Sequence, residues 1–146
     1  MPSHRGKFQK HSGGGSQLIV PVGIESIDGS LPYRGLVDTG ATRTAIREDL
    51  ARRLRLSPGA PVLMESPGQP PQWKNTYHLR MTLPRSGLKM MPAGRFEFYI
   101  TAVATDEMKD IDVFIGMDII GRSTLKVRGR GRRFKISFPR GIVVPR

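Results

Sequence analysis

One carboxylate in this sequence, Asp38, stands between an apolar pair and a Thr-Gly-Ala step at which the chain must turn. Aspartate is depleted in strands and glycine weakens them, so the pattern indicates a strand that ends by presenting a carboxylate. A carboxylate presented in this way can activate a water molecule when a second carboxylate supplies the acid. The alternative interpretation of a bare Asp-Thr-Gly is an ordinary turn in which the aspartate caps backbone amides.

A second stretch, far down the chain, bears on that choice. The run 112–121 is apolar almost throughout, which indicates a strand buried on both faces. Gly116 ends this strand, and residues 117–121 are predicted to form a single helical turn. A glycine at such a junction serves backbone geometry, and Asp118 can cap the turn that follows. Both residues are therefore expected to be structural rather than catalytic.

Composition limits the classes of protein that remain. The chain has 146 residues, enough for one domain with a real core, and a formal net charge of +12. It contains no cysteine, which excludes disulfides, a thiolate nucleophile and cysteine-based metal sites. No apolar run approaches the roughly 20 residues that a membrane span needs, and no signal peptide is evident. We expect a cytoplasmic protein that does not contact membranes.

The patterning predicts a mostly-β domain over 17–139. A flexible basic tail is expected over 1–16, because this polar, glycine-rich segment cannot bury enough surface to order itself, and a short C-terminal tail over 140–146. Residues 46–56 place apolar side chains at helical spacing. Residues 62–73 start as a strand and break at prolines, which predicts a hairpin with a Pro/Gly tip. The remaining strands are predicted over 17–27, 31–37, 76–83, 95–103, 112–116, 125–127 and 134–138.

Together, Asp38-Thr39-Gly40-Ala41 and the later Ile115-Gly116-Met117-Asp118 resemble the retropepsin-like aspartic proteases, in particular their cellular and bacterial members. The resemblance covers the order of elements from about Leu18 to Pro139. It implies a retropepsin-like acid-protease half-barrel with one or two short helices. Because this chain has a single Asp-Thr-Gly, it also implies a homodimer in which each chain supplies one carboxylate.

The resemblance also implies the roles of individual residues. Asp38 would be the catalytic acid or base, Thr39 would tie the two loops together, and Gly40 would let substrate approach the backbone. The hairpin would be a flap that closes over a peptide or protein substrate and excludes water. Terminal segments 17–22 and 134–138 would build much of the dimer interface. No cofactor and no metal is implied. The residues expected to bind substrate are Ala41, Thr42, Arg43, Met64, Glu65, Ser66, Pro67, Gly68, Ile115 and Gly116.

Two alternatives stay open. From Arg122 onward the chain is rich in lysine and arginine and contains no acid, so the basic 126–135 hairpin could bind nucleic acid through phosphates. Against this, the only aromatic residues nearby, Phe134 and Phe138, alternate as core residues do. The other alternative is a retropepsin-like fold that binds peptides as a dimer with weak turnover or none.

Overall fold

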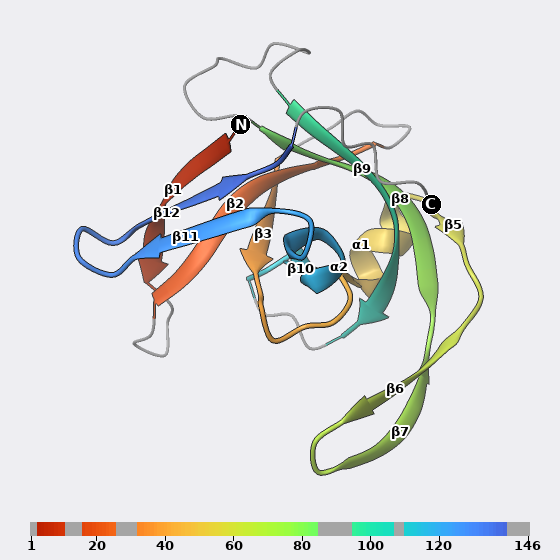
Figure 1. Cartoon of the computed structure of the whole chain (residues 1–146). Helices are drawn as coiled ribbons and strands as arrows, with labels where there is room; N and C mark the ends of the chain where they lie inside the picture. Colours follow the sequence, from red (N-terminus) through yellow and green to blue (C-terminus); the bar gives the residue numbers. More distant parts are fainter. Residues whose placement is uncertain (1–2, 11–15, 26–31, 85–94, 107–109, 140–146) are drawn as a thin grey trace.

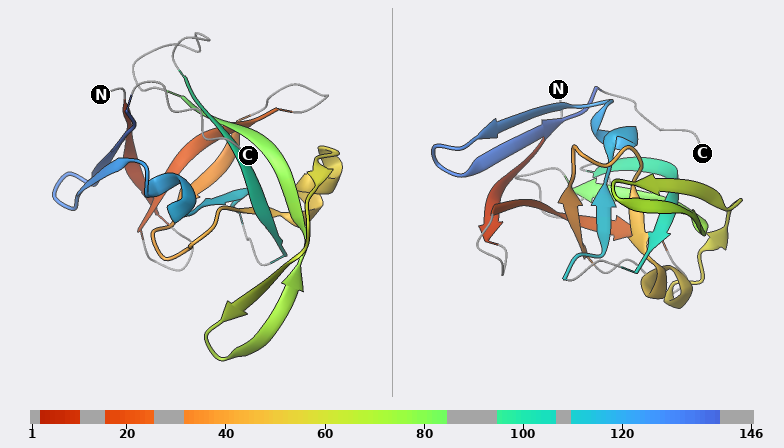
Figure 2. Two further views of the ribbon diagram at one scale, coloured as in Figure 1. Left: turned by 45° about the vertical axis from the view of Figure 1, so that its right-hand side comes forward. Right: turned by 90° about the horizontal axis from the view of Figure 1, so that it is seen from below.

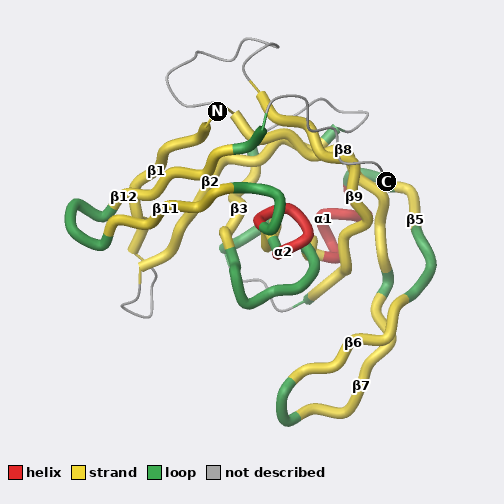
Figure 3. The backbone as a smooth tube through the Cα atoms, viewed as in Figure 1, coloured by secondary structure: helices red, strands yellow, loops and turns green. Residues whose placement is uncertain are grey.

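The computed structural model of the chain describes residues 3–10, 16–25, 32–84, 95–106 and 110–139. Strands dominate this part of the chain, as the tube in Figure 3 shows, and two short helices accompany them. The prediction of a mostly-β fold with one or two short helices is confirmed. The C-terminal tail predicted over 140–146 lies outside the described residues.

The described elements follow one another in this order. The first are β1 (Ser3–Lys10), β2 (Ser16–Ile24), β3 (Tyr33–Val37), β4 (Ala45–Arg47), α1 (Glu48–Arg53) and β5 (Ser57–Pro58). They are followed by β6 (Val62–Ser66), β7 (Gln69–Lys74), β8 (Thr76–Pro84) and β9 (Arg95–Thr105). The last are β10 (Val113–Ile115), α2 (Met117–Ile120), β11 (Thr124–Arg128) and β12 (Arg133–Ser137).

Ten of the described strands form one sheet, in the order β11-β12-β1-β2-β3-β10-β4-β9-β8-β5, and β2 also pairs with β8. That additional pairing closes the strands from β2 to β8 into a barrel-like ring, which Figure 1 shows end-on, and α2 lies at one end of this ring (Figure 2). β1, β12 and β11 extend from the ring as an arm, and β10 runs parallel to β3 and antiparallel to β4. The later apolar segment, which contains β10, thus lies beside β3, the strand that ends directly before Asp38.

Alternating side chains of the ring fill the core. The inward positions of β8 are buried as its pattern predicts, at Tyr77, Leu79, Met81 and Leu83. Directly after β12, Phe138 is fully buried, and its ring centroid lies 4.7 Å from that of Phe96 and 5.0 Å from that of Phe98. Aromatic pairs at this separation contribute about 0.5–1.5 kcal/mol each beyond their burial. This cluster anchors the end of β12 to β9.

The N-terminal segment corrects the sequence prediction. Residues 3–10 were expected within a flexible tail, whereas they form β1, which pairs with β12 through Ser3–Lys7 and with β2 through Phe8–Lys10. Gly6 lies so close to the ring of Phe134 that a Cβ atom there would stand 2.5 Å from it. Composition misses this strand because its main partner lies at the opposite end of the chain. Residues 11–15 of the predicted tail lie outside the described residues.

Two further elements differ in extent from the prediction. The helix expected over 46–56 is limited to α1, because Ala45–Arg47 pair with β9 and Ile46 with β10, which keeps this segment extended. The predicted break at Pro70 and Pro71 does not occur, because β7 continues through both prolines. Prolines are tolerated there because β6 and β7 form a sheet of their own, in which each strand has a free edge.

Candidate active site

Asp38 lies at the end of β3, where the chain leaves the sheet. The backbone N–H of Asp38 donates to the carbonyl of Ile115 at 3.0 Å and so completes the parallel pairing of β3 with β10. The next residues form a turn. The N–H of Gly40 donates to Oδ1 of Asp38 at 3.0 Å, and the N–H of Ala41 donates to the backbone carbonyl of Asp38 at 3.3 Å. Asp38 is half-buried, while Thr39 and Gly40 are exposed. A carboxylate is therefore held in place by a backbone amide and stands next to solvent.

The far end of this loop is fixed to the junction of β10 and α2. Thr44 is fully buried; its N–H donates to both carboxylate oxygens of Asp118 at 3.0 Å, and its hydroxyl donates to Oδ1 at 2.7 Å. The Thr44 hydroxyl in turn accepts the N–H of Gly116 at 3.1 Å. The N–H of Met117 donates to the carbonyl of Ala41 at 2.8 Å. These bonds fix the Asp38 loop at both ends.

Asp118 has a larger structural role than the predicted one. Its Oδ1 accepts the backbone N–H of Ile119 at 3.0 Å in the first turn of α2, as expected of a residue that caps this turn, although the N-cap position itself is occupied by Gly116. Gly116 lies against the loop so closely that a Cβ atom would stand 2.5 Å from the carbonyl carbon of Arg43. Both residues are structural, as predicted. Their contacts show what they position, namely the loop that carries Asp38.

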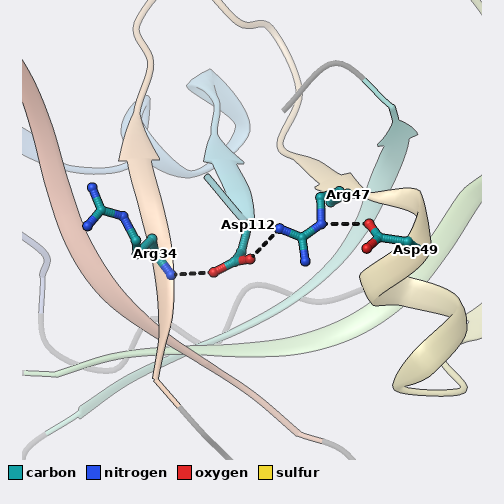
Figure 4. A network of polar contacts seen from close by, with 4 residues as sticks. All are labelled: Arg34, Arg47, Asp49 and Asp112. Carbon is teal, nitrogen blue, oxygen red and sulfur yellow. Dashed lines mark hydrogen bonds and ion pairs between the residues drawn. The ribbon is translucent and has the colours of Figure 1, made fainter. Parts of the chain in front are cut away.

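The opposite end of β10 is fixed by a second polar network, drawn in Figure 4. Asp112 accepts the backbone N–H of Arg34 at 2.8 Å through Oδ2 and the Nη1 of Arg47 at 2.9 Å through Oδ1. Arg47 also reaches Asp49, with Nε donating to Oδ1 at 2.6 Å. Burial acts to raise the pKa of Asp49, but the hydrogen bond and charge of Arg47 outweigh it, and the pKa lies below its ordinary value. The network sets the register of β3, β10 and β4.

The predicted flap is a hairpin of β6 and β7, which pair only with each other. In Figure 1 and in the left view of Figure 2 the hairpin extends away from the ring of strands. Gly68 at its tip has φ +76°, a conformation that favours glycine. Met64 is half-buried, and Glu65, Ser66, Pro67 and Gly68 are exposed. The hairpin therefore projects from the ring of strands and has an exposed tip.

The base of the hairpin, by contrast, is fixed to α1. The carboxylate oxygen Oε1 of Glu48 accepts the Tyr77 hydroxyl at 2.7 Å, the Arg52 Nε at 3.1 Å and the Asn75 amide at 3.3 Å. Burial acts to raise the pKa of Glu48, but these three donors together lower it below its ordinary value. The hydroxyl of Thr76 donates to the carbonyl of Ala60 at 2.8 Å and so ties the two ends of the hairpin together.

The predicted substrate-binding residues occupy different environments. Thr42 is exposed and Ala41 half-buried, beside Asp38 on the same loop. Arg43 is half-buried, with its Nη2 3.5 Å from the carbonyl of Thr101. Gly116 is buried beneath the loop, and Ile115 has no exposed surface. The side chain of Ile115 therefore lies in the core rather than on a peptide-binding surface, because none of it is exposed.

Three exposed apolar side chains were not among the predicted site residues. Leu63 and Trp73 face each other across the hairpin strands and are 50% and 71% exposed. Met117 is 41% exposed and adjoins the Asp38 loop through its bond to Ala41. The single tryptophan of the sequence, beside the predicted hairpin tip, was a signal that could have identified Leu63 and Trp73.

Within the described residues, no group of three His, Cys, Asp or Glu side chains is placed to bind a metal ion, and neither helix is long and apolar enough to cross a bilayer.

Comparison with known proteins adds to this geometry. A family model described as "Aspartyl protease" matches residues 22–119. Among solved structures, the chain resembles a retropepsin-like aspartic protease from Rickettsia conorii, with a TM-score of 0.54, 12% sequence identity and coverage of 93% of this chain and 92% of that one. No curated protein matches the sequence. The structural likeness extends over nearly the whole of both chains.

Proposed function

This chain belongs to the aspartyl protease family, and we propose that it is an aspartic endopeptidase that acts as a homodimer with one Asp38 from each chain. The observation that carries the proposal is the single Asp38, half-buried at the end of β3 and braced on one side by Gly40 and on the other by the Thr44–Asp118 bonds. One such carboxylate can be a base or an acid in a given step, but not both. A symmetric dimer supplies the second.

In the proposed reaction the two Asp38 side chains share one proton, since like charges at hydrogen-bond distance cannot both be ionised. The ionised carboxylate takes a proton from a water molecule as that water attacks the scissile carbonyl carbon. The other carboxylic acid donates its proton to the carbonyl oxygen. Collapse of the resulting tetrahedral diol then breaks the C–N bond, and a proton passes to the leaving amine. No metal or cofactor enters this scheme.

Several of the remaining predicted site residues have places in the same scheme. Thr39, exposed beside Asp38, would contact its symmetry mate, and Gly40 would face the peptide backbone. Thr42 and Arg43 would contact substrate side chains, with Glu65, Ser66, Pro67 and Gly68 at the flap tip above them. Leu63 and Trp73 would supply the apolar cover that excludes water from the reacting atoms.

The proposed interface differs from the one that the resemblance implies. Neither β2 nor β12 is an edge strand: β2 lies between β1 and β3, and β12 lies between β1 and β11. Phe134, Ile136 and Phe138 are buried within one chain. We therefore place the two-fold axis at the Asp38 loops, whose exposed Thr39 and Gly40 can meet their symmetry mates.

The test is cleavage of a mixed peptide library between about pH 4 and 7 by the parent and by Asp38→Asn, which keeps the shape but removes the ionisable group. We expect cleavage by the parent, highest on the acidic side where the shared proton is retained, and none by the variant. Asp106→Asn, an exposed aspartate, is the matched control and should cleave as the parent does. A parent that forms dimers and binds peptides without cleaving any would instead be a binding module.

A further inference from the structure

The arm formed by β1, β12 and β11 carries six cationic side chains on one face. The strand register sets Arg5, Lys135 and Lys126 directly opposite one another, and Lys7, Arg133 and Arg128 form a second row two residues along. Side chains of paired residues share a face, and so do residues two apart on a strand. We call these six residues the basic face. Two of them belong to β1, the strand that composition assigned to a tail.

The other side of the arm is apolar and belongs to the core. The intervening positions are Gly6 opposite Phe134, and His4 opposite Ile136. Phe134 and Ile136 are 2% and 1% exposed. Because strand residues alternate between faces, burying this side forces the charged residues onto the other. Apart from the half-buried Lys135, all members of the basic face are exposed.

Six cationic side chains on one face of a sheet repel one another and destabilise the fold unless negative charge compensates them. Like charges directly opposite on neighbouring strands destabilise a sheet. Here each row places three cationic residues on adjacent strands, whose backbones lie about 4.8 Å apart, and the two rows are separated by about 6.8 Å along the strands. A hollow of about 510 Å³ lies over this arm, lined by the six cationic residues together with Gly6 and Phe134, and no acidic residue from the described part of the chain lines it. The concentrated charge indicates a polyanionic partner.

We propose that the basic face binds the phosphate backbone of double-stranded DNA without reading its sequence. A duplex presents one negative charge per about 1.7 Å of its axis, which matches a dense array of cations. Single strands are bound through stacking on aromatic side chains, and no aromatic side chain of the described arm is exposed on this face. The turn between β11 and β12 adds the exposed Arg130 and Arg132.

The basic face is separate from the Asp38 loop. In the sheet, β2 lies between β1 and β3, and Asp38 directly follows β3. In Figure 1 the arm and the hairpin of β6 and β7 lie on opposite sides of the ring. Two copies of the basic face would repel each other, so the face does not serve the proposed dimer. DNA binding and peptide cleavage can therefore be tested independently, and Asp38→Asn should bind DNA as the parent does.

The experiment is fluorescence anisotropy with a 20-base-pair duplex, using the full chain at 50 and 200 mM salt. If all six cations contact phosphates, the affinity should fall about a thousandfold over this range. The triple variant Lys126→Gln, Arg128→Gln, Arg133→Gln should bind at least tenfold more weakly, with a salt slope shallower by about 3. The matched control Arg53→Gln, Arg55→Gln, Arg122→Gln removes the same charge from exposed sites outside the basic face and should bind within twofold of the parent.

A second variant, Arg5→Gln with Lys7→Gln, tests whether β1 contributes and should also weaken binding more than Arg53→Gln with Arg55→Gln. Thermal melts show that each variant is folded, and removing like charges from the basic face should raise its Tm. Equal losses in the face and control variants would overturn the proposal, because net charge alone would then explain binding. Tighter binding to single-stranded DNA, to polyglutamate or to phosphatidylglycerol vesicles than to the duplex would overturn it as well.

Discussion

The loop that carries Asp38 and the hairpin of β6 and β7 are held in opposite ways. The loop is bonded at both ends, through Ile115 and Thr44, to the short strand β10 and the helix that follows it. The hairpin forms a separate two-stranded sheet, and its tip from Glu65 to Gly68 is exposed. In an enzyme of this proposed kind, the first part must hold charged groups in a fixed geometry and the second must open and close.

The two regions also differ in where their stabilising bonds lie. In the loop they surround the functional side chain itself, whereas in the hairpin they lie at its base, around Glu48 and Thr76. A lid fixed at its base and free at its tip can move as a unit. This comparison makes the expected effects of substitutions specific: changes at the loop should damage stability and chemistry together, and changes at the exposed part of the hairpin should affect substrate binding more than global stability.

The largest effect is expected at Asp118. Asp118→Ala removes the acceptor for the N–H and hydroxyl of the fully buried Thr44. Leaving such donors without a partner costs about 2–3 kcal/mol, and the loosened loop should lower kcat/KM by about a hundredfold or more. Denaturant unfolding and peptide cleavage measure the two effects. Asp110→Asn, an exposed aspartate, is the control. Unchanged stability in Asp118→Ala would show that the loop does not depend on this brace.

The next largest effect is expected at Trp73 in the hairpin, where a substitution should change substrate binding but not stability. Trp73→Ala removes a side chain that is 71% exposed, so the free energy of unfolding should change by less than about 0.5 kcal/mol. If the apolar face of the hairpin covers the substrate, KM should rise several-fold while kcat falls less. Val127→Ala, on a similarly exposed apolar residue of the arm, should leave both constants unchanged. A large loss of stability in Trp73→Ala would contradict the comparison.

A smaller effect concerns the base of the hairpin and depends on pH. The pKa of Glu48 is lowered in the folded chain, so its contribution to stability is present above its unfolded pKa and is lost as the pH falls through its folded pKa. The parent should therefore melt at a higher temperature than Glu48→Gln at about pH 7, and this gap should close towards about pH 3. A gap that stays constant over this range would mean that the charge of Glu48 does not contribute.

The smallest effect is expected at the hairpin tip. Gly68→Ala introduces a side chain at φ +76°, where no other atom lies within 4 Å. The strain is about 1 kcal/mol and is confined to the turn, so the global melting temperature should change little. Faster amide hydrogen exchange in β6 and β7 alone is the expected result. Faster exchange spreading to β8 and β9 would show that the hairpin is coupled to the ring.

Sequence patterns predicted the parts of the fold that depend on local order. The alternation in β8 and the strand-to-helix junction at Gly116 were visible because a short window contains the whole signal. The strand β1 was missed because its pairing partner β12 comes from the other end of the chain. The bonds between Asp118 and Thr44 were missed for the same kind of reason, since an aspartate at a helix start predicts a local bond to the helix and only the folded chain brings Thr44 to it.

The basic face shows the same limit. The cations of the 126–135 hairpin were evident in the sequence, but Arg5 and Lys7 were assigned to a tail and their alignment with the hairpin was not foreseeable. In the opposite sense, Ile115 was expected to bind substrate because it adjoins a family motif, whereas it is fully buried. Motif position identifies the neighbourhood of a site, and burial decides which side chains can reach a ligand.

One measurement tests the proposed mechanism most directly. Parent and Asp38→Asn chains are mixed at constant total concentration, allowed to exchange subunits, and assayed for peptide cleavage as the fraction of parent varies. If a dimer needs Asp38 from both chains, activity follows the square of that fraction, so that an equal mixture retains about a quarter of the parent activity. Activity that falls in direct proportion to the fraction of parent would contradict the proposal, because each chain would then act on its own.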